Sequence, residues 1–198
     1  SDLAYSISFE YSENCAIENN RLESEYRVIF GYYSPSLTLS GNSVYGKSGY
    51  YAYRLRYCNH TSSIGDIING GYELNIYYCH YLNFDQLTMD ANGGILISEG
   101  SHIAIKNSHI KADSTRAVRI LSSPFVNIEN SFFSSDFNSG IQIQLCDNLS
   151  LKNCVVNDAS GDGIGVTNLS NVTISGCSVS DVTGNGMYLG VIQNATVT

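Results

Sequence analysis

The stretch "NLSLKNCVVNDASGDGIGVTNLSNVTISGCSVSDVTGNGMYLGVIQ", residues 148–193, contains the same pattern twice. Asn148 begins the first copy and Asn171 begins the second, and Cys154 of the first copy recurs as Cys177 at the same point of the second. Apolar and polar residues alternate after each Asn, as they do in a strand with one buried face. A short repeat of this kind is typical of a stacked architecture.

The pattern continues through the rest of the chain. The residues that anchor the successive copies are Ile17, Leu39, Asn59, Leu82, Ile105, Ile128, Leu151, Ile174 and Val197, with spacings of about 20–23 residues. A unit this short has three strands and no helical period, so it buries its inward side chains only by stacking on copies of itself. We therefore predict that residues 1–198 form one all-β domain. The predicted fold is a right-handed parallel β-helix of about eight to nine coils, without evident end caps.

The segment "NVTISGCSVSDVTGNGMYL" (171–189) resembles repeats of the pectin-lyase-like superfamily of parallel β-helices. Leucine-rich repeats have a similar length, but their Leu-x-x-Leu-x-Leu framework and helical return segment do not occur here. The resemblance implies the fold and not an activity. It also implies an asparagine ladder, in which each amide bonds the turn backbone and the next amide. The residues of this ladder are Asn19, Asn107, Asn130 and Asn153.

Composition excludes some classes of function. With 18 acidic and 10 basic side chains, the formal net charge of -8 opposes binding to nucleic acid, which needs a basic surface. No apolar run is long enough for a membrane span. An acidic chain rich in Tyr, Ser and Thr with an even number of cysteines fits an extracellular or cell-surface location.

The six cysteines show no spacing typical of a zinc site. Buried free thiols and disulfides are both open interpretations. Cys154 and Cys177 are one coil apart, about 4.8 Å, which lies within the Cα range that a disulfide accepts. Cys58 and Cys79 form the second candidate pair.

Acidic residues recur near one predicted turn. Asp90, Asp113 and Asp136 follow their anchors at the same offset, which predicts a column of carboxylates along one edge. Such a column would bind calcium or provide an acid/base pair for a glycosidase, whereas turn residues that point into water are the alternative. A similarity to pectate lyases would imply an arginine base, with Arg119 and its neighbour Arg116 as candidates. The specific motifs of pectate lyases, polygalacturonases and alginate epimerases are missing, since the sequence contains no NTD, GHG, RIK or DPH. No cofactor other than calcium is expected.

Aromatic residues and histidines add two further expectations. The tyrosines concentrate in 31–33, 50–57 and 71–81, where exposed rings would stack on sugars or on another subunit, or simply pack along a sheet. His80 falls at an inward position and is expected in the core, while the other histidines are expected on different faces.

Three functions follow from these observations. The first is a non-catalytic extracellular surface protein whose end coils associate head to tail into a filament, sheath or envelope assembly. The second is a polysaccharide lyase, hydrolase or epimerase acting on an acidic or cell-surface glycan. The third is a phage tailspike or appendage module that binds glycans. The expected partners are further copies of the chain and surface glycans.

Overall fold

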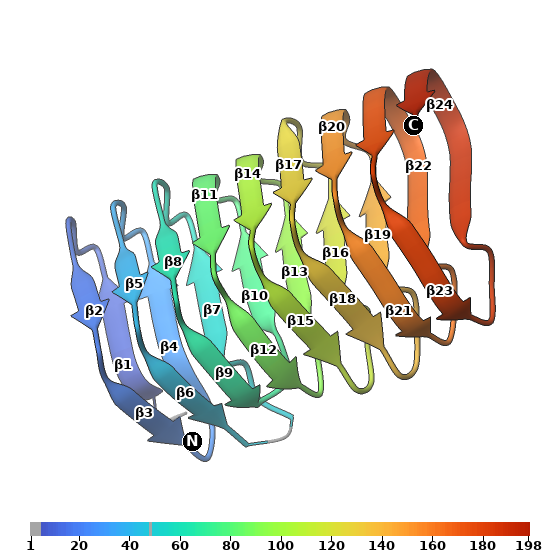
Figure 1. Cartoon of the computed structure of the whole chain (residues 1–198). Helices are drawn as coiled ribbons and strands as arrows, with labels where there is room; N and C mark the ends of the chain where they lie inside the picture. Colours follow the sequence, from blue (N-terminus) through green and yellow to red (C-terminus); the bar gives the residue numbers. More distant parts are fainter. Residues whose placement is uncertain (1–4, 48) are drawn as a thin grey trace.

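The computed structural model describes residues 5–47 and 49–198, and these residues contain strands and turns but no helix. The chain winds into a right-handed parallel β-helix of about eight turns, in which each strand pairs with its counterpart one coil away (Figure 1). Three faces of stacked strands run along the coil axis. Within the described residues, no helix is long and apolar enough to span a membrane.

Each coil contributes one strand to each face. Face 1 contains β1 (Tyr5–Glu10), β4 (Arg27–Tyr32), β7 (Tyr53–Arg56), β10 (Leu74–Tyr77), β13 (Ile95–Ser98), β16 (Val118–Leu121) and β19 (Ile141–Gln144). Face 2 contains β2 (Ala16–Glu18), β5 (Thr38–Ser40), β8 (Ser62–Ile64), β11 (His80–Asp85), β14 (Ser101–Lys106), β17 (Val126–Glu129) and β20 (Asp147–Lys152). The long strands β22 (Ile164–Ser175) and β24 (Met187–Val197) bend across faces 1 and 2. Face 3 contains β3 (Arg21–Ser24), β6 (Ser43–Gly46), β9 (Ile67–Gly70), β12 (Thr88–Ala91), β15 (His109–Ala112), β18 (Phe132–Ser135), β21 (Val155–Ala159) and β23 (Ser178–Val182).

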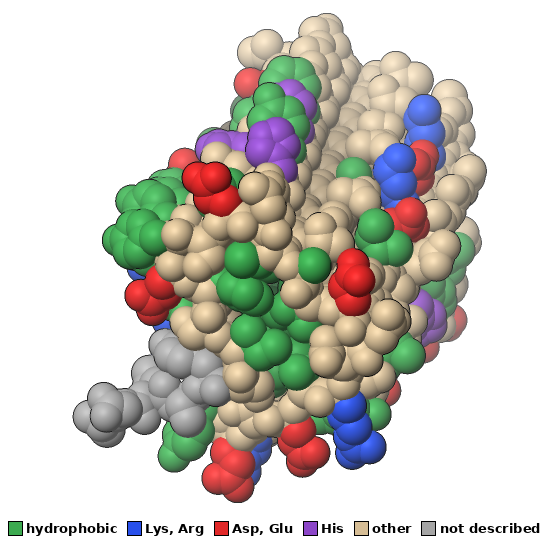
Figure 2. Space-filling model, turned by 90° about the vertical axis from the view of Figure 1, so that its left-hand side faces the viewer, with side chains coloured by type: hydrophobic (Ala, Val, Ile, Leu, Met, Phe, Trp, Pro, Cys, Tyr) green, Lys and Arg blue, Asp and Glu red, His purple; other side chains and the backbone are tan. Residues whose placement is uncertain are grey.

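Columns of apolar side chains fill the space between the faces. On face 2, Ile105 pairs with Phe84 of the preceding coil and with Ile128 of the following coil, and all three are fully buried. Burying one side chain of this size contributes roughly 1.5–3 kcal/mol. Figure 2, which views the stack from its N-terminal side, shows hydrophobic side chains in the middle of the end coil with polar and charged side chains around them. The predicted stacking is confirmed.

The register corrects the predicted phase of two coils. Leu39 pairs with Ser63, and Ser63 pairs with Phe84, so the anchors predicted at Asn59 and Leu82 are wrong. The interval from Leu39 to Ser63 is therefore longer than the predicted interval from Leu39 to Asn59. The interval from Ser63 to Phe84 is shorter than the predicted interval from Asn59 to Leu82. The apolar pattern missed this phase because a serine occupies the inward position.

A buried carboxylate explains why a serine is tolerated there. Asp66 is fully buried, and its Oδ2 accepts the hydroxyl of Ser63 at 2.6 Å and the phenol of Tyr53 at 3.1 Å. Its Oδ1 accepts the backbone N–H of Asn42 at 2.8 Å and the side-chain amide of the same residue at 3.0 Å. Four donors thus compensate for the lost hydration of the carboxylate.

The corners of the coils are built from residues in the left-handed backbone region. The corner between faces 1 and 2 begins in successive coils with Tyr11, Tyr33, Tyr57, Tyr78, Glu99, Ser122, Leu145, Asn168 and Val191, all at positive φ. The backbone N–H of such a residue donates to the next coil, as Tyr33 does to the Arg56 carbonyl at 3.0 Å. These coil-to-coil bonds offset the steric cost of the conformation.

Candidate anion-binding face

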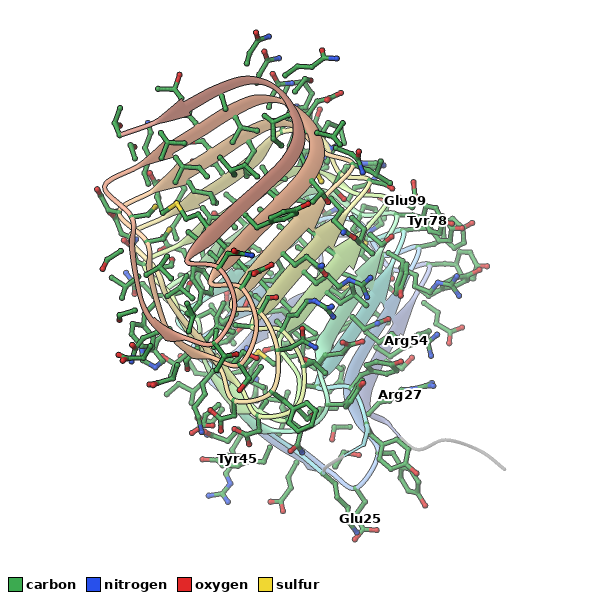
Figure 3. All side chains as sticks on the ribbon, turned by 90° about the vertical axis from the view of Figure 1, so that its right-hand side faces the viewer. Glu25, Arg27, Tyr45, Arg54, Tyr78 and Glu99 are labelled. Atoms are coloured by element: carbon green, nitrogen blue, oxygen red, sulfur yellow. The ribbon has the colours of Figure 1, made fainter. Side chains whose placement is uncertain are left out.

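Five of the six arginines of the chain lie on or beside face 1. They are Arg27, Arg54, Arg56, Arg116 and Arg119. Because successive side chains of a strand alternate between inside and outside, Arg54 and Arg56 of β7 both point away from the core, and their flanking residues Tyr53 and Leu55 are buried. Figure 3 shows Arg27 and Arg54 beside each other on this face. An acidic protein therefore carries one strongly cationic face.

Arg116 and Arg119 line a cavity of about 220 Å³ on this face. Its lining comes from three successive coils, and its other polar side chains are Tyr72 and Glu73, which precede β10, and Thr115, which precedes β16. Leu96 of β13, which pairs with Arg119 of β16 one coil away, gives the cavity an apolar floor. The cavity therefore combines an apolar floor with two cations and one carboxyl group.

Glu73 is the acidic group of this cavity. Burial raises the pKa of its carboxyl above the usual value, although the amide of Asn75, which donates to Oε1 at 2.7 Å, and the charge of Arg119 act in the opposite direction. Burial and the neighbouring charge of Arg119 lower the pKa of Arg116. Because an arginine pKa ordinarily lies above 12, the lowered pKa of Arg116 still leaves its guanidinium charged at neutral pH.

Four arginines of this face have no close acidic partner among the described residues. Among the described residues, Arg54, Arg56, Arg116 and Arg119 form no ion pair within 4.0 Å, and the Nε atom of each is buried without a hydrogen bond. A buried donor on a cation is costly when it has no acceptor. The outer N–H groups of the guanidiniums line cavities on this face, and a planar anion fits them because the guanidinium fork matches carboxylate and phosphate oxygens.

The predicted acidic column is organised differently from the expectation. Asp90 of β12 pairs in register with Lys111 of β15, and not with Asp113, because the phase of its coil was misassigned. The ammonium of Lys111 lies 3.7 Å from Asp90, 3.0 Å from Asp113 and 3.8 Å from Asp136. Its hydrogen bond to Asp113 raises the pKa of Lys111. A lysine thus lies among the carboxylates that were predicted to bind calcium.

Asp90 lies on face 3 and Asp113 and Asp136 follow β15 and β18 at its edge, whereas Arg119 lies on face 1. Within the part of the chain that the structure describes, no group of three or more His, Cys, Asp or Glu residues is arranged to hold a metal. The structure therefore does not bring Asp90, Asp113 and Asp136 together with Arg119 in one site.

The asparagines predicted as a ladder lie at the corner between faces 2 and 3, where Asn107, Asn130 and Asn153 are exposed and at positive φ. Asn153 donates from Nδ2 to Oδ1 of Asn130 at 3.2 Å, and Asn130 is 3.5 Å from Oδ1 of Asn107. Asn19 occupies the same corner, but its neighbour in the next coil is Gly41, which has no amide. This column faces solvent and holds neighbouring turns together.

The six cysteines are free thiols. Cys58 and Cys79 face each other in neighbouring coils, and the backbone N–H of Cys58 donates to the sulfur of Cys79 at 3.1 Å. Cys154 and Cys177 occupy equivalent positions at another corner, before paired β21 and β23. In-register parallel neighbours keep their Cβ atoms about 4.8 Å apart, beyond the roughly 3.5–4.5 Å of a disulfide. The expectation of disulfides considered only the Cα distance.

Serines and cysteines share one structural role, which we call the corner ladder. At the corner between faces 1 and 2, the buried residues of this ladder are Ser34, Cys58, Cys79, Ser123 and Cys146. Each donates to the carbonyl two residues earlier and accepts a backbone N–H of the preceding coil, as Cys146 does from Ser123 at 3.3 Å. Burial raises the pKa of Cys146 to about 11, so this thiol stays protonated at neutral pH.

Aromatic side chains stack along two edges of the corner between faces 1 and 2. The first stack contains Tyr11, Tyr33, Tyr57 and Tyr78, with ring centroids 4.5–5.5 Å apart. The second contains His60, Tyr81, His102 and Phe125, with centroids 4.5–4.7 Å apart, and Figure 2 shows alternating histidine and hydrophobic side chains along this edge. Because the rings cover each other, most of their flat faces are unavailable to sugars.

The histidine expectations were wrong in two respects. His80 pairs with Ser101 on face 2 and is only partly buried, and its Nδ1 lies 2.8 Å from the Ser101 hydroxyl. His60 and His102 belong to the same stack and not to different faces. Both errors arose because the anchors of the third and fourth coils were misassigned. The stack of His60, Tyr81, His102 and Phe125 could have been predicted, because these aromatic residues recur about once per coil.

Comparison with solved structures gives several β-helical proteins. A periplasmic alginate epimerase, AlgG, is 11% identical with a TM-score of 0.48, over 98% of this chain and 47% of that chain. The pectate lyase Pel9A is 12% identical with a TM-score of 0.39, over 96% and 57% of the two chains. PfbA, a surface adhesin of Streptococcus pneumoniae, is 8% identical with a TM-score of 0.40, over 96% and 79%.

The chain spans about half the length of the epimerase. Comparison with curated proteins finds no sequence match. The family model described as "Right handed beta helix region" matches residues 4–141 and 62–198, which together cover almost the whole chain. The chain belongs to this family of right-handed β-helix proteins.

Proposed function

We propose that the chain is a non-catalytic, extracellular or cell-surface β-helix that binds an acidic polysaccharide along face 1. The observation that carries this proposal is the set of four arginines that have no acidic partner within 4.0 Å among the described residues, on a protein of net charge -8. Guanidinium groups bind uronate carboxylates through two parallel hydrogen bonds, and tyrosines beside them contact the sugar rings. The acidic remainder of the surface repels the same polymer, so binding is confined to this face.

Binding to polygalacturonate, measured by calorimetry, tests the proposal. The double substitution Arg116→Gln and Arg119→Gln is expected to weaken binding at least about 10-fold, which corresponds to about 1.4 kcal/mol. Arg21→Gln is the matched control, because Arg21 lies on face 3, 3.9 Å from Glu23 and 4.8 Å from the Tyr45 ring. Figure 3 shows Tyr45 away from Arg27 and Arg54. Equal binding by the parent and the Arg116/Arg119 double variant, or equal binding of a neutral glucan, would contradict the proposal.

One observation favours the enzymatic alternative. The carboxyl of Glu73 has a raised pKa and shares a cavity with Arg116 and Arg119. A lyase or epimerase removes the proton next to a uronate carboxylate, for which an arginine would neutralise the carboxylate and Glu73 would exchange the proton. Incubation with polygalacturonate and with alginate distinguishes this alternative, since unsaturated or epimerised products would appear and Glu73→Gln would abolish them.

Association of end coils into a filament stays a prediction, as does the tailspike alternative. Electron microscopy of the purified chain tests the filament, for which ordered polymers are expected. Sedimentation tests the tailspike alternative, for which a trimer is expected.

A further inference from the structure

A second cationic cavity lies on face 1, towards the N-terminal coils. Its volume is about 340 Å³, and the arginines Arg27, Arg54 and Arg56 line it together with Phe30 and Tyr32. The guanidinium carbons of Arg54 and Arg27 lie 5.4 Å and 5.9 Å from the centre of the Tyr51 ring. Among the described residues that line it, Glu10 is acidic. We call this set the N-terminal cluster, and Arg116 with Arg119 the C-terminal cluster.

The register gives the distance between the two clusters. Arg54 pairs with Asn75, Asn75 with Leu96, and Leu96 with Arg119, so all four residues lie in one outward column of face 1. Three coil steps separate the two arginines, which is about 14 Å at the spacing of neighbouring strands. This distance is fixed by backbone pairing and does not depend on flexible loops.

The column between the clusters is uncharged. The side-chain amide of Asn75 donates to Glu73 at 2.7 Å, and Asn75 is 3% exposed. Leu96 presents an apolar side chain that is only partly buried. A ligand that reaches both clusters therefore lies across the uncharged side chains of Asn75 and Leu96. It carries anionic groups either at its two ends or along its whole length.

We propose that the two clusters are separate carboxylate-binding sites for one oligouronide chain that lies along the coil axis. This inference rests on the proposed function, because it assumes that the ligand of face 1 is an acidic glycan. A single carboxylate binds at one cluster at a time, whereas a chain long enough to reach both gains a second contact at high effective concentration. The length of the oligouronide then decides the affinity.

Titration with galacturonate oligomers of increasing length tests this inference. The parent is expected to bind a dimer weakly and a hexamer about 100-fold more tightly, because only the hexamer reaches both clusters. In the variant Arg54→Gln with Arg56→Gln, the dimer is expected to bind the C-terminal cluster still, while the advantage of the hexamer disappears. The variant Arg116→Gln with Arg119→Gln is expected to behave in the same way, and Arg21→Gln is the control for loss of one positive charge.

The outcomes separate this inference from the proposed function. If the parent binds no oligomer of any length, the proposed function is wrong. If the parent binds oligomers but the variant without Arg54 and Arg56 keeps the full advantage of the hexamer, binding occurs at one cluster and the two-site inference is wrong. Thermal unfolding of each variant identifies loss of folding, in which case single substitutions replace the double ones and the same comparison is made.

Discussion

Glu73 is the residue at which burial and charge oppose each other most directly. Its carboxyl is removed from water, accepts a hydrogen bond from Asn75 and lies near Arg119, and burial is the largest of these effects. The folded state therefore binds the proton of Glu73 more tightly than the unfolded chain does. The stability that this proton contributes is complete below the unfolded pKa of about 4.3 and is lost as the pH rises through the raised folded value.

Glu73→Gln is expected to raise the melting temperature relative to the parent at about pH 7, with a smaller difference at about pH 4. The reason is that glutamine keeps the acceptor for Asn75 and carries no charge to bury. Thermal unfolding followed by circular dichroism at both pH values measures the difference. A variant that is less stable than the parent at neutral pH would show that the charge of Arg119 outweighs burial.

We expect Lys111 to compete with calcium for the acidic residues of face 3 and its edge. Its ammonium contacts three carboxylates, all of them substantially exposed, so each pair contributes little to stability. We expect millimolar calcium to leave the melting temperature of the parent unchanged and to raise that of Lys111→Gln, because the carboxylates then lack a cation. Lys47→Gln, which removes an exposed lysine paired with Glu25, is the control. A calcium effect in the parent would instead support the predicted metal site.

At the scale of elements, the corners connect one coil to the next. A residue at positive φ is followed by a buried Ser or Cys whose side chain accepts a backbone N–H of the preceding coil. This arrangement explains why cysteines recur at equivalent places without forming disulfides. It also satisfies backbone groups that a tight turn would otherwise leave unpaired inside the molecule.

Cys79→Ala is expected to lower the free energy of unfolding by about 1–3 kcal/mol, because the buried N–H of Cys58 loses its acceptor. Cys79→Ser keeps an acceptor of similar size, so its loss is expected to be smaller. Urea unfolding with and without reductant measures both variants. Equal losses of unfolding free energy for alanine and serine would show that the volume of the sulfur, and not the hydrogen bond, stabilises the corner.

The sequence predicts the elements best where repeats are regular. The intervals between the anchors are all equal from Ile105 onwards, and the pairing of Ile105, Ile128, Leu151 and Ile174 follows them. The earlier coils could not be phased, because Ser63 is polar and inward while Ile64 is apolar and exposed. The aromatic stacks and the N-terminal arginine cluster depend on that phase. Arg116 and Arg119 were identified as candidates from the sequence. That they lack close acidic partners among the described residues could not be predicted, because it depends on distances between side chains of different coils.

At the scale of the whole molecule, charge and shape are distributed unevenly. Face 1 carries most of the arginines, face 3 carries the carboxylates around Lys111, and the corner between faces 1 and 2 carries stacked rings. A coil has neighbours on only two sides, so each face can change its chemistry without disturbing the interior shared by all three. One scaffold thus presents three chemically distinct surfaces.

The parallel pairing of the arginine column has a consequence for how such proteins diverge. Insertion of one complete coil between β7 and β10 would increase the separation of Arg54 and Arg119 by a single step of about 4.8 Å and keep the residues that line each cavity together. The number of coils between the two clusters in a related chain would then set the length of acidic polymer that it prefers. That length would change in steps of one coil, without any new side chains.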